Sequence, residues 1–339
     1  MKNFNPERII GGTDSQKEGF KVTLEQAAKK SGEELFGELL LEPTPEEKLA
    51  IATAVEYVNR ISKKYGAEHE MDENRIFLLE KDGISSSTNG RLNHGMCDLL
   101  HKCVAVDESL SNAILSTNIV HEGFHITSYH SFQIMEDNVE TLYRGGISMV
   151  DRKDKGIYLA KAEEAIIATL SQNFFEEVIC KDPFYAEEIR KTLEVKTWLI
   201  NFASESKSLN EEGRKRLLDI FKEIRLLPDV DSVYFNLLEN NEKGDLYKFG
   251  YFTGYFEEKL SETLHERAEE RKVFNEVLDR LVVDSKGVLG TKEELFDHFA
   301  RAHFTGNYFP LARLIDGALE KGSFRKVAIE LGNMYTETE

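Results

Sequence analysis

The stretch SNAILSTNIVHEGFHITSYH, residues 111–130, combines a broad apolar face with metal-binding side chains. Its apolar residues recur at the three- and four-residue spacing of a helix that packs one side against a core. They include Ala113, Ile114, Ile119, Val120 and Phe124. The spacing predicts a helix here, with His121 and His125 one turn apart on the same side. The fold must therefore pack a helix that presents two imidazoles.

The segment HEGFH has the spacing of a catalytic zinc site. Imidazoles at positions i and i+4 of a helix can bind one ion, and a catalytic zinc takes three protein ligands and leaves a fourth place for water. A carboxylate outside the ligand set can then accept the proton of that water. We expect His121 and His125 to be zinc ligands and Glu122 to be the general base. The alternative is an ordinary helix with incidental histidines.

His130 is the nearest candidate for a third ligand, but its spacing does not fit the metzincin pattern. It comes nine residues after His121, where that pattern requires ten, and the intervening ITSY contains no glycine to break the helix. The metzincin pattern is therefore excluded. We interpret His130 as a surface residue or as a partner of a metal ligand.

A carboxylate on a second helix is the better candidate. The sequence predicts that residues 159–179 are helical and follow a hairpin in YRGGISMVDRKDKGIY that reverses the chain. Glu163 and Glu164 differ by about 100° around the helix axis, so normally one of them faces the metal. Glu164 shares the apolar side of the helix with Ile167 and Leu170. We therefore expect Glu164 to be the third ligand, with Glu163 as the alternative.

HEGFH, followed about forty residues later by GIYLAKAEEAIIATL, resembles the gluzincin branch of zinc metallopeptidases, in particular small bacterial, thermolysin-like members. In these a hairpin leads to a helix that begins with an Asn-Glu-Ala-type motif. Glu163-Glu164-Ala165 matches that motif with Glu in place of Asn. The likeness covers about residues 75–178, and it implies the same three ligands and the same base.

The sequence departs from that family one turn after the proposed glutamate ligand. Thermolysin-like enzymes carry an acidic residue there that orients a histidine, and this chain has Ala168. The partner that fixes the tautomer of a ligating histidine must then come from elsewhere. Asp151, Asp154 and Glu163 are the candidates.

The flanking segments predict an α+β fold. Thr44 before PEEKLAIATAVEYVNRISKKYG has the pattern of an N-cap, with proline at the first helical position, and predicts a helix over 45–64. Short apolar segments predict strands near 75–80, 91–97 and 102–107. We expect a small, mostly antiparallel sheet packed on the HEGFH helix, followed by a largely helical C-terminal domain. The resemblance implies that this arrangement is zincin-like.

The length of 339 residues favours more than one domain. We predict an N-terminal extension over 1–44, a zincin-like catalytic domain over 45–180 and a helical domain over 181–339. The net charge of −18 disfavours nucleic acid and anionic membranes as partners. Three cysteines, no visible signal peptide and no apolar run long enough to span a bilayer predict a cytoplasmic protein.

Other polar residues carry weaker signals. A hydrolase needs a group that stabilises the oxyanion, and the family resemblance suggests a tyrosine or histidine from the C-terminal part: Tyr251, Tyr255, His265 or His303. Arg144 is compatible both with a role at the site and with a structural role in the hairpin. His94, Cys97, His101 and Cys103 are all residue types that bind zinc and give a second candidate site, but their spacing matches no zinc-finger or zinc-ribbon pattern.

Three functions are consistent with these patterns. The first is a zinc metallopeptidase that hydrolyses peptides or proteins through a metal-activated water and Glu122. The second is a catalytically inactive, zincin-like binding or regulatory protein that uses the same cleft. The third is an interaction protein whose acidic helical region carries the function. Metal content separates the third from the others, and turnover separates the first from the second.

Overall fold

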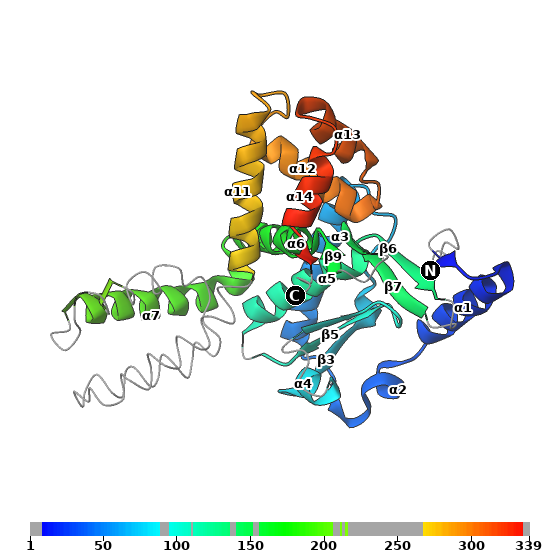
Figure 1. Cartoon of the computed structure of the whole chain (residues 1–339). Coiled ribbons are helices and arrows are strands. Elements are labelled where there is room, and N and C mark those ends of the chain that lie inside the picture. The colour runs from blue at the N-terminus through cyan, green and yellow to red at the C-terminus, as the bar shows by residue number, and fades with distance from the viewer. Residues whose placement is uncertain are drawn as a thin grey trace, which may run out of the picture.

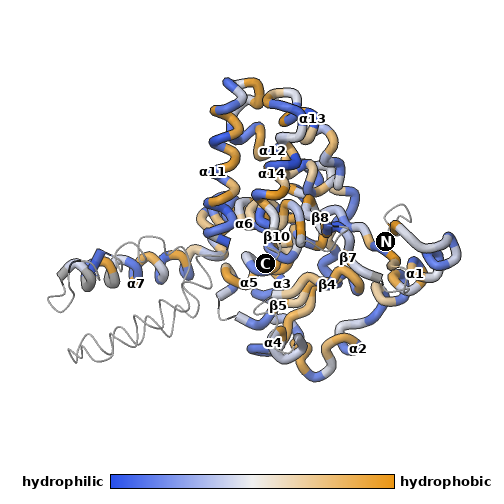
Figure 2. Tube along the Cα trace, viewed as in Figure 1, coloured by the Kyte–Doolittle hydropathy of each residue, from blue (hydrophilic) through white to orange (hydrophobic). Residues whose placement is uncertain are grey.

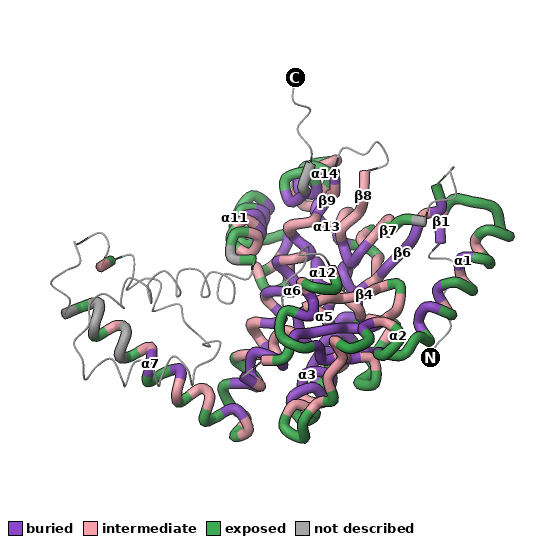
Figure 3. The backbone as a smooth tube through the Cα atoms, turned by 90° about the horizontal axis from the view of Figure 1, so that it is seen from below, coloured by how far each residue is buried: buried purple, intermediate pink, exposed green. Residues whose placement is uncertain are grey.

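The structure, a computed structural model, describes residues 9–88, 95–109, 111–135, 140–151, 156–205, 211, 214–215 and 267–334. Within these ranges the fold is mixed, with many helices around two small sheets and a helical C-terminal region (Figure 1). None of the described helices is long and apolar enough to cross a membrane. The buried segments gather around the helices at the centre of the molecule (Figure 3).

The four-stranded sheet has the order β2-β3-β5-β4 and is mixed. Its strands are β2 (Leu40–Leu41), β3 (Ile76–Leu79), β5 (Cys103–Asp107) and β4 (Gly95–Asp98). β3 and β5 are parallel, and β2 and β4 pair antiparallel on the outer sides. Strands lie near the three expected positions, although residues 91–94 lie outside the described part of the chain. Two of the three pairings are antiparallel, as expected, and the pairing of β3 with β5 is parallel. The chain passes through α4 (Gly83–Ser87) and β4 between β3 and β5, so β5 returns in the direction of β3.

The two faces of this sheet pack against different helices, because successive side chains of a strand point to opposite sides. On one face Ile76, Leu78, Val104 and Val106 join the main core with α3 (Pro45–Lys64) and α5 (Asn112–Thr127). On the other face Leu79 and Ala105 pack with Phe36 of α2 (Gly32–Phe36) and Ile84 of α4. β5 is buried over its whole length. The HEGFH helix α5 therefore rests on a sheet that is itself covered on its far side.

The helix α3 spans the predicted residues and begins with the predicted cap. Thr44 accepts a hydrogen bond from the backbone N–H of Glu47, and the Glu47 side chain accepts one from the N–H of Thr44. The neighbouring α5 approaches α3 closely at Gly123. A Cβ atom there would lie 2.7 Å from Sδ of Met71 and 2.9 Å from Cγ2 of Val58. The glycine inside the HEGFH helix thus permits the close packing of α3 on α5.

The second sheet has six strands in the order β1-β6-β7-β8-β9-β10. They are β1 (Ile9–Gly11), β6 (His130–Ile134), β7 (Glu140–Gly145), β8 (Ser148–Val150), β9 (Gly156–Tyr158) and β10 (Asn333–Met334). β1 is parallel to β6, and the other neighbours are antiparallel. The segment predicted as one hairpin forms three strands, β7 to β9. They lead into α6 (Ala160–Phe174), which continues as a π-helical turn over Phe175–Ile179.

The N-terminal residues contribute to both sheets. β1 and α1 (Asp14–Ala27) pack through Ile9, Phe20 and Leu24 against β6, while β2 pairs with β3 in the other sheet. β2 therefore lies at the edge of the four-stranded sheet opposite β4. The domain boundaries at residues 44 and 180 stay predictions.

The C-terminal region is helical in its described residues. It consists of α7 (Ala186–Glu205), α11 (Ala268–Asp284), α12 (Lys292–Thr305), α13 (Phe309–Ala318) and α14 (Ser323–Glu330). α7 projects away from the rest, whereas α11 lies against α6 (Figure 1). Hydrophobic and hydrophilic residues alternate along α11 (Figure 2), as in an amphipathic helix. Its buried residues Phe274, Val277, Leu278 and Leu281 belong to the same core as α5 and α6.

Candidate metal centre

The N-terminus of α5 is held by a carboxylate from α7. The hydroxyl of Ser111 caps the helix by accepting from the N–H of Ile114 at 3.1 Å, and it donates to Oε2 of Glu188 at 2.6 Å. Glu188 also accepts from the N–H groups of Asn112 and Ala113, at 3.0 and 3.1 Å. A negative charge at this end of a helix is favoured by the helix dipole. This anchor fixes the helix that carries HEGFH.

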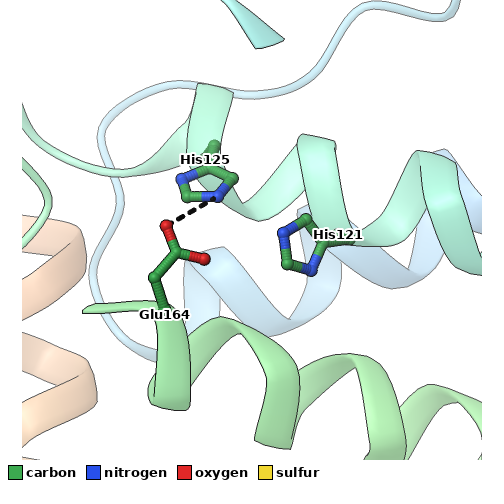
Figure 4. Close-up of side chains that lie close together, drawn as sticks. All are labelled: His121, His125 and Glu164. Atoms are coloured by element: carbon green, nitrogen blue, oxygen red, sulfur yellow. Dashed lines mark ion pairs between the residues drawn. The ribbon is translucent and has the colours of Figure 1, made fainter. Parts of the chain in front are cut away.

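The side chains of His121, His125 and Glu164 converge between α5 and α6 (Figure 4). One ligand atom from each lies within 4.8 Å of the others, and Nε2 of His125 is 3.8 Å from Oε1 of Glu164. Donor atoms about 2.0–2.2 Å from a tetrahedral ion lie about 3.3–3.6 Å apart, so small side-chain movements suffice to close this group on a metal. It is the one such group among the described residues.

Two adjacent glutamates face the two nitrogens of one imidazole. Oε1 of Glu163 lies 3.7 Å from Nδ1 of His125, while Glu164 faces Nε2. Glu163 is 8% exposed, and its Oε2 accepts a hydrogen bond from the N–H of Ser148 at 3.2 Å. Glu164 therefore belongs to the group that could hold a metal, which we call the metal-binding group, and Glu163 lies outside it beside His125.

The two histidines have different proton affinities. Burial lowers the pKa of His121 to about 4, so this ring is neutral near pH 7. Burial also disfavours charge on His125, but Glu163, Glu164 and Glu122 outweigh it and raise the pKa of His125 to about 9. Because a metal requires unprotonated imidazole nitrogen, binding would release a proton from His125.

The position of Glu122 is set by a glycine on the neighbouring strand. A Cβ atom at Gly95 of β4 would lie 3.1 Å from both Cγ and Oε1 of Glu122. Glu122 therefore lies against the backbone of β4 and outside the metal-binding group. Its charge acts on both His121 and His125, in each case favouring the protonated ring and so raising the pKa.

The residues considered for a second zinc site do not gather in the described part of the chain. Cys103 pairs with Asp98 in the β4–β5 ladder, whereas Cys97 pairs with Val104, so the two thiols point to opposite faces. His101 instead contacts Asp98, with 2.7 Å between Nδ1 and Oδ2. Burial and then nearby carboxylates raise the pKa of the Cys97 thiol. His94 lies outside the described residues.

His130 was considered as a third ligand and His303 as an oxyanion donor, and both side chains are buried. His130 lies in β6, where it is 9% exposed and contacts the hydroxyl of Ser128 at 3.2 Å, so it is not on the surface. His303 on α12 is fully buried, and burial lowers its pKa to about 4. It fills the space beside Gly146, where a Cβ atom would lie 2.2 Å from Nδ1 of His303. Its role as an oxyanion donor stays a prediction. The other candidates, Tyr251, Tyr255 and His265, lie outside the described residues.

Arg144 is a structural residue. Its guanidinium lies 4.9 Å from the ring centres of Tyr129 and Tyr308, and it donates a hydrogen bond to the carbonyl of Gly306 at 2.9 Å. It thereby joins β7 to the connection between α12 and α13. These contacts give Arg144 a structural place beside the hairpin.

The chain has Ala168 where thermolysin-like enzymes carry an acid that orients a histidine. Of the three residues expected to replace that acid, Glu163 is the one with a described contact to His125. Ala168 is buried on α6, 5% exposed. Asp151 directly follows β8, and its backbone N–H donates to the carbonyl of Gly156. Asp154 lies outside the described residues. Among the candidates, the described contact with His125 is made by Glu163.

Arg267 is a residue at this centre that sequence patterns did not indicate. Its Nε lies 3.0 Å from Oε2 of Glu164. The two residues are more than a hundred positions apart in the chain, and no motif surrounds Arg267. A single sequence carries no signal for such a contact.

Comparison with known proteins identifies no family for this chain. No known family, no characterised protein and no solved structure matches the chain. The candidate metal centre therefore rests on the convergence of His121, His125 and Glu164 and on the position of Glu122 beside them.

Proposed function

We propose that the protein is a zinc-dependent metallopeptidase with a zincin-like catalytic region. The observation that carries this proposal is the set of two imidazoles and one carboxylate from α5 and α6, with Glu122 outside the set. Two imidazoles with a glutamate form the ligand set of catalytic rather than structural zinc, because it leaves a position open. The chemistry of the donors also argues against Ca²⁺ or Mg²⁺, which prefer oxygen ligands.

The residues around the site have separate parts in the proposed reaction. Zinc, when bound, supplies a Lewis acid that lowers the pKa of water toward neutrality. Glu122 accepts a proton as the water oxygen attacks the peptide carbonyl carbon, and it then gives that proton to the amine nitrogen as the C–N bond breaks. Glu163, whose Oε1 lies 3.7 Å from Nδ1 of His125, would accept the Nδ1–H after a small movement and so keep Nε2 available as a ligand.

The strand β4 suits an extended peptide substrate. It lies at the edge of the described four-stranded sheet, and its residue Gly95 is next to Glu122. An edge strand offers backbone N–H and C=O groups to a further strand. A peptide paired with β4 would bring its backbone to Glu122. The proposed substrate is therefore an extended segment of a peptide or protein.

Removal and return of zinc tests this proposal. We expect the purified protein to cleave an unstructured protein such as casein, to lose this activity after treatment with a chelator, and to regain it when one equivalent of zinc is added. Mass spectrometry of the fragments measures the cleavage. Cleavage that persists at full rate in metal-free protein would contradict the proposal.

A non-catalytic binding protein is the second candidate. It is favoured by the full burial of His303, one of the expected oxyanion donors. Such a protein would bind zinc and an extended peptide at β4 without cleaving it. Zinc binding combined with intact peptide after long incubation would select this function over the first.

A further inference from the structure

The carboxylate of Glu164 is held from both sides. Its Oε1 faces Nε2 of His125 at 3.8 Å, and its Oε2 lies 3.0 Å from Nε of Arg267. One oxygen is thus directed to the metal-binding group and the other to a guanidinium. A carboxylate with its second oxygen paired in this way has one oxygen left for a metal.

The guanidinium is itself fixed by its surroundings. Nη1 of Arg267 lies 3.6 Å from Oε1 of Glu270, one turn further along α11. The next arginine on the same side, Arg271, donates from Nη1 to Oε1 of Gln172 on α6. Together with the apolar contacts of α11 on α6, these pairs hold Arg267 in place opposite Glu164.

The backbone of Arg267 adopts an unusual conformation. Its φ of 55° and ψ of 33° are in the left-handed region, and its side chain makes no capping hydrogen bond to α11. Non-glycine residues avoid this region unless surrounding contacts compensate. In this conformation the side chain of Arg267 forms the ion pair with Glu164.

We propose that Arg267 is a positioning residue of the metal centre, which holds Oε2 of Glu164 and thereby presents Oε1 to the ion. This inference rests on the proposed zinc site. A glutamate side chain loses rotational freedom when it binds a metal, and Arg267 imposes that restriction beforehand. The guanidinium is 46% exposed, so water screens its repulsion of a nearby dication.

Zinc affinity measured by competition with a chromophoric chelator tests the proposal. We expect Arg267→Met to weaken zinc binding about 10–100-fold, the range for loss of a residue that supports a ligand. Arg267→Lys should recover part of this loss, because lysine keeps the charge but not the planar geometry. With Co²⁺ in place of zinc, the visible absorption of the Arg267→Met protein should also shift, which a purely structural role would not cause.

The matched control is Arg280→Met on the same helix. Arg280 pairs with Glu330 at 2.8 Å, a contact on α14 outside the metal-binding group, so the variant removes the same charge and should bind zinc like the wild type. Melting temperatures of the metal-free proteins establish that each variant is folded. Zinc binding by Arg267→Met as tight as, or tighter than, that of the wild type would overturn the inference alone. Failure of the wild type to bind zinc would overturn the proposed function and this inference with it.

Discussion

Glutamine in place of Glu122 is expected to lower the rate of peptide hydrolysis by about 10²–10⁴-fold, the range for loss of a general base. The carboxamide has nearly the shape of the carboxylate, so the contact with Gly95 of β4 should persist. It cannot accept the proton of the attacking water. Since Glu122 lies outside the group of His121, His125 and Glu164, zinc should remain bound at one equivalent. Initial rates and metal analysis of the same preparation measure the two effects.

The control for this variant is Glu56→Gln, which makes the same chemical change at an exposed residue of α3. It should retain wild-type activity and zinc. Full activity in the Glu122→Gln protein would exclude Glu122 as the base, and loss of zinc in that protein would show that Glu122 is itself a ligand.

Alanine at Glu164 is expected to remove stoichiometric zinc, whereas alanine at the adjacent Glu163 should leave the metal bound more weakly. The first change deletes the oxygen that faces Nε2 of His125, and the second deletes the acceptor at Nδ1. Loss of an acceptor behind a ligating histidine weakens metal binding about 10–100-fold. Loss of one of three protein ligands should exceed that effect. Zinc content after gel filtration and affinity by competition measure both.

The two variants control for each other, because they remove the same group from neighbouring positions of α6. Glu163→Ala also frees the N–H of Ser148, so unfolding of both metal-free proteins must be compared with the wild type. The opposite order, with zinc retained in Glu164→Ala and lost in Glu163→Ala, would exchange the roles that the geometry gives to the two glutamates.

The local parts of the site were predictable from the sequence because helical periodicity decides them. The helix that carries His121 and His125, and the helix that carries Glu164, follow from the spacing of their apolar residues. The choice of Glu164 over Glu163 followed from the apolar side of the second helix. In the structure Glu164, and not Glu163, belongs to the group of residues that could hold a metal ion, and its role as a ligand stays a prediction.

The contacts that complete the centre depend on residues far apart in the chain. Glu188 reaches the start of α5 from α7, and Arg267 reaches Glu164 from α11. Neither lies in a motif, and their positions depend on how separate helices pack. The spacing of apolar residues within one segment indicates which side of that helix or strand is buried. It does not indicate which residues of distant segments, such as Glu188 and Arg267, will contact it.

The positions of the strands were easier to predict from the sequence than the direction in which neighbouring strands run. Alternating or apolar segments mark a strand but do not give the direction of its neighbour. The parallel pairs β3–β5 and β1–β6 arise from how the chain crosses between them. The strand β1, Ile9–Gly11, is also too short to be distinguished from a turn by its sequence.

Two imidazoles from α5 and a carboxylate from α6 are proposed to bind a single zinc ion. X-ray absorption spectroscopy of the zinc-loaded protein measures this ligand set. We predict a first shell of nitrogen and oxygen atoms alone, at about 2.0–2.2 Å, with the scattering signature of two imidazoles. A sulfur ligand at about 2.3 Å, as Cys97 or Cys103 would provide, or a shell without imidazole, would rule out this metal centre.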